Sequence, residues 1–154
     1  MQGIDKYRRL YKAIGYTFTN EALLEQALTH RSAAKQHNER LEFLGDAILG
    51  MIVGETLFKR FPTVPEGKLT RMRSTLVKGD TLAELAKEAS VGELLNLGPG
   101  ELKSGGHRRS SILADAVEAI LGAIYLDSGM DEVRGVIDRL WETRINKLDP
   151  NAHP

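Results

Sequence analysis

The sequence predicts an all-α domain, and three observations support this. Apolar residues recur with the period of a helix along almost the whole chain, and no segment alternates convincingly with the period of two that a half-buried strand shows. Residues that begin or end helices fall at the edges of these segments. The chain has 154 residues and no internal repeat, a length that suits one domain with one core.

The apolar pattern divides the chain into seven expected helices joined by short polar segments. In order, the expected ranges are 4–14, 21–28, 39–60, 65–78, 81–90, 112–128 and 132–149. Residues suited to helix N-termini precede or open six of them: Asn20, Asn38, Pro65, Asp80, Ser110 or Ser111, and Asp131. Glycines suited to helix C-termini follow three of them: Gly15, Gly79 and Gly129. The segment 98–111, with four glycines and a proline, is expected to be a loop.

The helix expected at 39–60 carries acids in an otherwise apolar stretch, ERLEFLGDAILG. Glu39, Glu42 and Asp46 are spaced so that they fall within about 60° of one another on a helix. The rest of the stretch is mostly apolar and reads as buried. This placement of three carboxylates on one face requires a physical reason.

A second apolar helix, ILADAVEAILGAIYL at 112–126, carries Asp115 and Glu118 three residues apart and no basic residue. If the two acidic faces meet, the repulsion out of water costs several kcal/mol unless protons or cations compensate. Oxygen ligands of this kind suit Mg²⁺, so one interpretation is a magnesium site. The alternative is structural, with each acid paired to a buried arginine or capping a backbone group.

The formal charge is zero, with 21 basic and 21 acidic residues, but the basic residues are concentrated. Between residues 59 and 78 there is one acid, Glu66, and six bases: Lys59, Arg60, Lys68, Arg71, Arg73 and Lys78. Between residues 103 and 109 there are three further bases and no acid: Lys103, Arg108 and Arg109. Either segment could bind phosphates or could simply be a solvated helix face.

Several other classes of protein are disfavoured. No apolar run approaches the ~20 residues of a membrane span, so no membrane partner is expected. The chain has no cysteine and starts without a secretory apolar segment, which fits a cytoplasmic protein. No phosphate-loop motif indicates a nucleotide cofactor, no glutamate has a histidine three residues later, and the histidines show no metal-ligand spacing.

Five segments resemble blocks of the ribonuclease III family, and they occur in the family's order. They are ALTHRS (27–32), NERLEFLGDAIL (38–49), PEGKLTRMRSTLV (65–77), LGPGELKSGG (97–106) and ILADAVEAILGAIYLDSG (112–129). The chain is therefore similar to the catalytic domain of a bacterial ribonuclease III over nearly its whole length. The resemblance implies a homodimeric, all-helical endonuclease domain that acts on double-stranded RNA.

The resemblance also implies roles for individual acids. Glu42, Asp46, Asp115 and Glu118 would form the cluster that binds Mg²⁺, for which Mn²⁺ can substitute. Asp46 and Glu118 would be the residues most needed for catalysis. The products would carry 5′-phosphate and 3′-hydroxyl ends with staggered cuts, and the expected role is processing of ribosomal and messenger RNA.

Other residues would serve the dimer and the substrate. Glu39 and Glu66 resemble a second acidic pair that meets across the dimer, and Phe43 matches a position that packs into the partner subunit. The bases that could contact RNA are Lys68, Arg71, Arg73, Lys103, Arg108 and Arg109. His107 and Ser110 depart from the family, which often has an arginine and an acid there.

We expect residues 1–149 to be the catalytic domain, with 150–154 as a disordered tail or the start of a linker. Bacterial members usually carry a double-stranded-RNA-binding domain after the catalytic one, and its absence here favours a truncated chain. Two alternatives remain open. One is an all-α, Mg²⁺-dependent nucleotide pyrophosphohydrolase, and the other is a non-catalytic protein that binds double-stranded RNA on the same fold.

Overall fold

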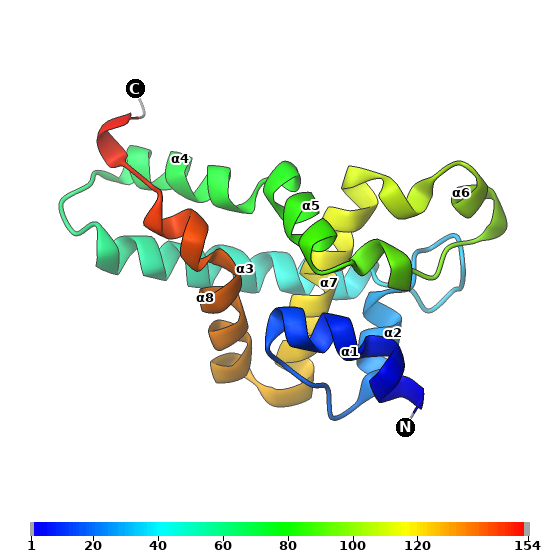
Figure 1. Ribbon diagram of the computed structural model, residues 1–154. Helices are drawn as coiled ribbons and strands as arrows, with labels where there is room; N and C mark the ends of the chain where they lie inside the picture. Colours follow the sequence, from blue (N-terminus) through cyan, green and yellow to red (C-terminus); the bar gives the residue numbers. More distant parts are fainter. Residues whose placement is uncertain (1, 153–154) are drawn as a thin grey trace.

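The computed structural model describes residues 2–152 of the chain, and these residues form helices and no strand, as predicted (Figure 1). The α-helices are α1 (Gln2–Ile14), α2 (Glu21–Ala27), α3 (Glu39–Arg60), α4 (Glu66–Val77), α5 (Gly79–Glu88), α6 (Pro99–Lys103), α7 (Ser110–Ser128) and α8 (Met130–Asn146). Three short 3₁₀ helices are η1 (Val91–Leu94), η2 (Gly106–Arg108) and η3 (Pro150–Ala152).

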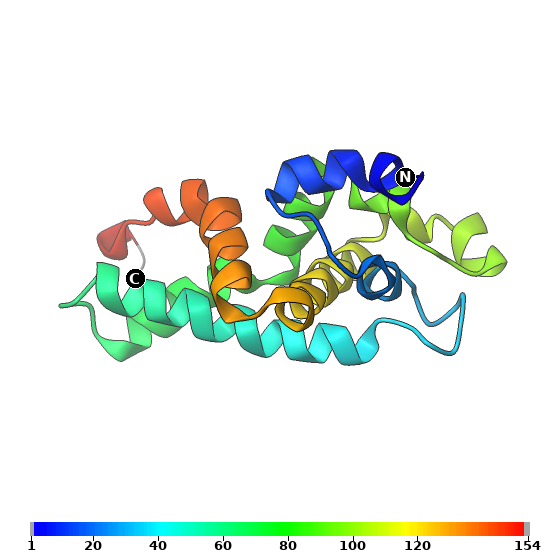
Figure 2. The same cartoon turned by 90° about the horizontal axis from the view of Figure 1, so that it is seen from below.

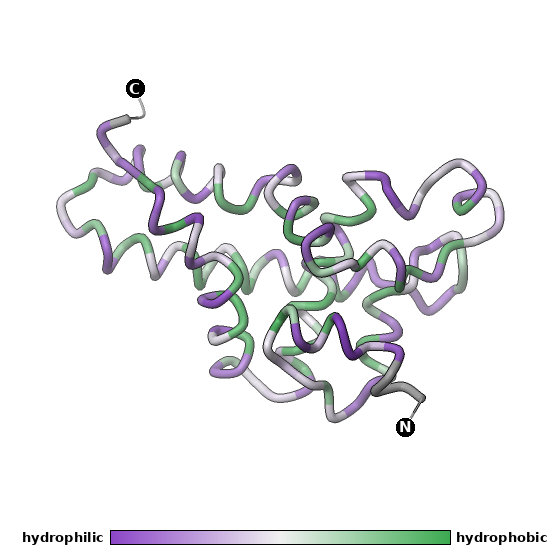
Figure 3. The backbone as a smooth tube through the Cα atoms, viewed as in Figure 1, coloured by the Kyte–Doolittle hydropathy of each residue, from purple (hydrophilic) through white to green (hydrophobic). Residues whose placement is uncertain are grey.

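Helix α7 is the centre of the core, and α3 crosses it (Figures 1 and 2). Every residue of α7 from Ile112 to Ile124 is buried except Asp115. A helix that is apolar on all sides must be covered on all sides, and α2, α3, α5 and α8 supply that cover. The hydropathy colouring of α7 in Figure 3 shows the same feature.

Two glycines bring the backbones of α3 and α7 into direct contact. A Cβ atom on Gly45 of α3 would lie 1.7 Å from the carbonyl oxygen of Glu118. A Cβ on Gly122 of α7 would lie 2.4 Å from the carbonyl oxygen of Leu41. Neither position has room for any side chain, so the glycines set the distance between the two helices.

Helix α8 returns over the end of α4 and fixes it to the core. Trp141 is fully buried, and its indole N–H donates a 2.8 Å hydrogen bond to the carbonyl oxygen of Leu76. This bond uses one of the carbonyl groups that the end of α4 leaves without a helical partner. The aromatic ring therefore contributes both buried area and a helix cap.

Several predicted caps are wrong in detail. The Asn20 side chain does accept from the N–H of Ala22, as expected. The buried Asn38 side chain instead donates to the carbonyl oxygen of Ala27, and only its backbone joins α3. Gly79 opens α5 rather than closing α4, and the N-cap positions of α5, α7 and α8 are occupied by Lys78, Arg109 and Gly129.

The segment 98–111, expected to be a loop, contains α6 and η2, and α7 begins within it. Helices of three to five residues bury too little surface to leave a periodic signal in the sequence. The residues before α6 are also tied to the connector between α2 and α3. Thr29 and Asn96 form a single parallel bridge, and the Gly98 N–H donates to the Ser32 hydroxyl at 2.9 Å.

At the end of the chain, residues 150–152 of the expected tail form a 3₁₀ turn, and residues 153–154 lie outside the described part. Residue 1 also lies outside it. Within residues 2–152, no helix has both the length and the apolar character that crossing a membrane would require.

The close helix crossing predicts that replacing a glycine by alanine affects stability very differently at the crossing and away from it. Gly122→Ala forces α3 and α7 apart, and we expect the free energy of unfolding to fall by roughly 3 kcal/mol. Gly135→Ala is the matched control, because that helical glycine in α8 has only a flexible arginine side chain at 3.5 Å. It should gain up to about 1 kcal/mol from helix propensity. Urea denaturation measures both, and equal effects would contradict the close contact.

Candidate metal centre

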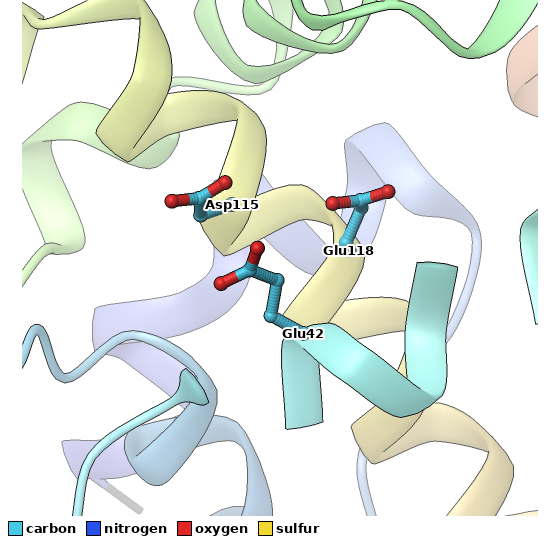
Figure 4. A group of neighbouring side chains, drawn as sticks. All are labelled: Glu42, Asp115 and Glu118. Atoms are coloured by element: carbon cyan, nitrogen blue, oxygen red, sulfur yellow. The ribbon is translucent and has the colours of Figure 1, made fainter. Parts of the chain in front are cut away.

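The crossing of α3 and α7 brings three predicted acids together. Glu42 comes from α3, and Asp115 and Glu118 come from α7, one turn apart (Figure 4). One carboxylate oxygen of each residue lies within 4.8 Å of the others. Glu42 lies one turn before Gly45, and Glu118 one turn before Gly122, so the glycine contact sets the separation of the acids.

Asp46, the fourth predicted acid, joins the cluster from its solvent side. Asp46 is exposed, whereas Glu118 is only 8% exposed. The Asp46 and Glu118 side chains are within hydrogen-bonding reach, and so are those of Glu42 and Asp115. The structure therefore places all four acids in one group at the helix crossing.

Burial and mutual repulsion make these acids hard to ionise. Burial, followed by the hydrogen bond and charge of Asp46, raises the pKa of Glu118 to about 9. Burial, followed by the charge of Asp115, raises the pKa of Glu42 to about 7. Burial also raises the pKa of Asp115 above its ordinary value. At neutral pH the cluster therefore favours either bound protons or a bound cation.

Among the described side chains, no ion pair neutralises the cluster, although the nearby His30 opposes the rise in the pKa of Asp115. None of the eight ion pairs among the side chains of residues 6–151 includes any of the four acids. Nor do the hydrogen bonds described there link their carboxylates to a backbone N–H. The structural alternative, with arginine partners or backbone caps, is therefore wrong for these four. Clustered carboxylate oxygens without a cationic partner fit a hard divalent cation such as Mg²⁺.

A cavity of about 610 Å³ opens beside the cluster. Glu42 and Asp115 line it, together with residues of the α2–α3 connector and of the loop that carries α6. Three basic side chains line the same cavity: His30, Arg31 and Arg109. The cavity thus combines carboxylates with groups that can bind an anion.

Sequence reasoning gave no role to His30 or Arg31, and it also missed Glu101, which lines the same cavity. Its carboxylate forms an ion pair with Arg109, and its side chain packs against Gly106. Arg109, expected as a free RNA contact, is therefore held by an acid. The signal available was that Glu101 lies in LGPGELKSGG, one of the five family-like segments.

The second predicted acidic pair is not brought together within one chain. Glu39 begins α3, where Arg31 lies 3.7 Å from its carboxylate, and Glu66 begins α4, where it accepts a hydrogen bond from Thr70. Because α3 has 22 residues, about 33 Å separate its two ends. Only a second subunit could place Glu39 and Glu66 side by side.

Phe43 of α3 is 80% exposed, although its side chain is large and apolar. The predicted RNA contacts are mostly exposed as well: Arg71, Arg73, Lys103, Arg108 and Arg109 are exposed, and Lys68 is half-buried. Apart from Arg109, none of these six forms an ion pair within the part of the chain that the structure describes.

An all-helical domain with acids gathered at a cavity is typical of metal-dependent hydrolases. A model of the family described as Ribonuclease-III-like matches residues 20–144. The chain is 58% identical to Ribonuclease 3 of Shewanella amazonensis over 99% of its own length and 67% of that protein. It is 61% identical to Ribonuclease 3 of Aliivibrio fischeri over 94% of its own length and 65% of that protein.

A solved structure is similar to this chain as well. The nuclease domain of ribonuclease III from Campylobacter jejuni superposes with a TM-score of 0.87 at 40% identity, covering 91% of this chain and 99% of that one. The chain therefore belongs to the ribonuclease III family of enzymes, and its fold is that of the family's nuclease domain. It spans about two thirds of the length of the curated relatives.

The raised pKa values predict an unusual pH dependence without metal. Between about pH 4.5 and pH 9 the folded protein keeps a proton on Glu118 that the unfolded chain has released. The free energy of unfolding therefore falls as pH rises through this range. Glu118→Gln should remove much of this fall and raise stability at pH 8 by on the order of 2 kcal/mol. Urea denaturation with a chelator at pH 5 and pH 8 measures this.

Glu142→Gln, which changes an exposed acid of α8, is the control and should leave the pH dependence unchanged. If Glu118→Gln lowers stability at both pH values, Glu118 is a satisfied structural group rather than a strained one.

Proposed function

We propose that this chain is the catalytic part of a Mg²⁺-dependent endoribonuclease that cuts double-stranded RNA. The observation that carries the proposal is the group of four acids at the α3–α7 crossing, none of which forms an ion pair among the described side chains. The names of the relatives support the reaction type, and residues 1–149 contain the whole matched family region. A cytoplasmic role in processing ribosomal and messenger RNA precursors fits this activity.

Glu42, Asp115 and Glu118 would hold the metal ion, because their oxygens already lie within 4.8 Å of one another. Bound Mg²⁺, or Mn²⁺ in its place, would supply an activated water and neutralise charge on the phosphate and on the leaving oxygen. Asp46 would keep Glu118 oriented through their hydrogen bond and is exposed to receive solvent and substrate. The proposed products have 5′-phosphate and 3′-hydroxyl ends.

The chain's own cations would position the RNA. Arg31 and Arg109 line the cavity beside the acids and can bind the phosphodiester, and Glu101 holds the Arg109 side chain in place. The exposed bases of α4 and of the α6 loop would add contacts to neighbouring phosphates. Such contacts carry little base specificity, since A-form RNA is recognised mostly by shape, and they weaken as salt rises.

Two copies of the chain would form the active enzyme. The C. jejuni nuclease domain is described as having a region involved in dimer formation. In this chain the exposed Phe43 and the separation of Glu39 from Glu66 support the same assembly. Each subunit would cut one strand, which gives staggered ends.

A substrate panel tests the proposal. Labelled duplex RNA, single-stranded RNA, duplex DNA and nucleoside triphosphates are incubated with the protein at low salt, with Mg²⁺ or Ca²⁺. We expect cleavage of duplex RNA only, with Mg²⁺ only, and a fall of more than about 100-fold in Glu118→Gln. Triphosphate hydrolysis would support a pyrophosphohydrolase instead. Duplex binding without cleavage would support a non-catalytic RNA-binding protein.

A further inference from the structure

The outward face of α3 carries an exposed apolar stripe. Phe43 is 80% exposed, Met51 is 51% exposed and Phe58 is 71% exposed, and Ala47 is exposed between them. At 100° per residue these four positions share an arc of about 80°. Gly54 lies within the same arc and Gly50 about 20° outside it, and a Cβ on Gly50 would have no neighbour within 4 Å. Small residues thus separate the aromatic ones.

The occupant that fits this stripe is a second copy of the chain, as the proposed function requires. In a two-fold dimer, α3 can pack on the partner's α3 in parallel or antiparallel. The charges decide between the two. The first turns of α3 carry three acids and one base, Arg40. Residues 59–78, which span the end of α3 and the whole of α4, carry six bases and one acid, Glu66. Only the antiparallel arrangement places acidic ends against basic ends.

The aromatic residues then set the register. Phe43 and Phe58 are equidistant from the point between Gly50 and Met51, so an antiparallel pair centred there places Phe43 against the partner's Phe58. Each residue of the stripe then faces the residue of the partner's stripe that lies equally far from the centre, on the opposite side. Ala47 therefore faces the partner's Gly54, and the small residues allow the backbones to approach.

Gly54 of α3 is also in contact with a basic side chain of α4, that of Arg73. A guanidinium nitrogen of Arg73 lies 3.3 Å from the place where a Cβ on Gly54 would be. Arg73 is exposed and forms no ion pair with the described side chains of residues 6–151. By contrast, Arg71 is directed back along α4, with a guanidinium nitrogen 3.8 Å from the corresponding point on Gly67.

Because Ala47 is the neighbour of Asp46, the register brings Arg73 of one subunit beside the acidic cluster of the other. We infer that Arg73 acts in trans: it extends over Gly54 at the subunit interface and binds the RNA phosphate at the partner's active site. The inference rests on the proposed nuclease function. It assigns each active site four acids from one subunit and a cation from the other.

Mixed dimers test the inference directly. Arg73→Ala homodimers should cut duplex RNA roughly 10-fold to 100-fold more slowly than wild type, with Arg8→Ala, an exposed arginine of α1, unchanged. A heterodimer of one Glu118→Gln subunit and one Arg73→Ala subunit, purified with two tags, should recover about half the wild-type nicking rate, because one of its two sites is complete.

A second heterodimer pairs a wild-type subunit with a subunit that carries both Glu118→Gln and Arg73→Ala. It should stay as slow as the Arg73→Ala enzyme, because the intact acids lack the partner's arginine. If the first heterodimer is inactive and the second is active, Arg73 acts within its own subunit and the inference fails. If wild type itself does not cut duplex RNA, the proposed function fails instead.

Cross-linking tests the register without metal, substrate or activity. The chain has no cysteine, so single replacements react alone. Phe43→Cys mixed with Phe58→Cys should be joined by a short bis-maleimide, whereas Phe43→Cys alone should not, since its two copies would lie about 22 Å apart. Met51→Cys, near the two-fold axis, should cross-link to itself. Efficient joining of Phe43→Cys to itself would indicate parallel packing and would overturn the inference.

Discussion

The structure depends on the contact between the backbones of α3 and α7 at Gly45 and Gly122. Helices separated by ordinary side chains pack 8–10 Å apart, and a glycine contact brings them closer. The acids lie one turn away on each helix, so the short distance between the two helices also brings the acids close together. Without the glycines, Glu42 could not approach Asp115 and Glu118 closely enough to share a ligand, so one steric feature fixes both the core and the site.

The same contact imposes an electrostatic cost. Glu118 is buried among apolar residues of α7, and this burial, followed by the hydrogen bond and charge of Asp46, raises its pKa to about 9, so its charged form is unfavourable there. The apolar packing around α7 must outweigh that cost for the chain to fold without metal. A structural ion pair would have removed the cost, but it would also have filled the position that a metal ion requires.

The elements with long periodic patterns could be predicted from the sequence, and so could the gathering of acids on α3 and α7. The details that failed depend on residues distant in the chain. Asn38 caps α2 through the Ala27 carbonyl, and Glu101 holds Arg109 across the α6 loop. Local pattern carries no information on such partners, nor on a bridge such as that between Thr29 and Asn96.

Helix α3 shows why a second subunit and an active site can share one element. Its faces are separate: Gly45 meets α7, Glu42 lines the cavity, and Phe43 and Phe58 face outward. Because 3.6 residues complete each turn, neighbouring residues of α3 point to different faces of the helix. A partner that packs on the outer face of α3 therefore lies within a few residues of the acids. One helix can thus contribute both to a dimer interface and to the metal site.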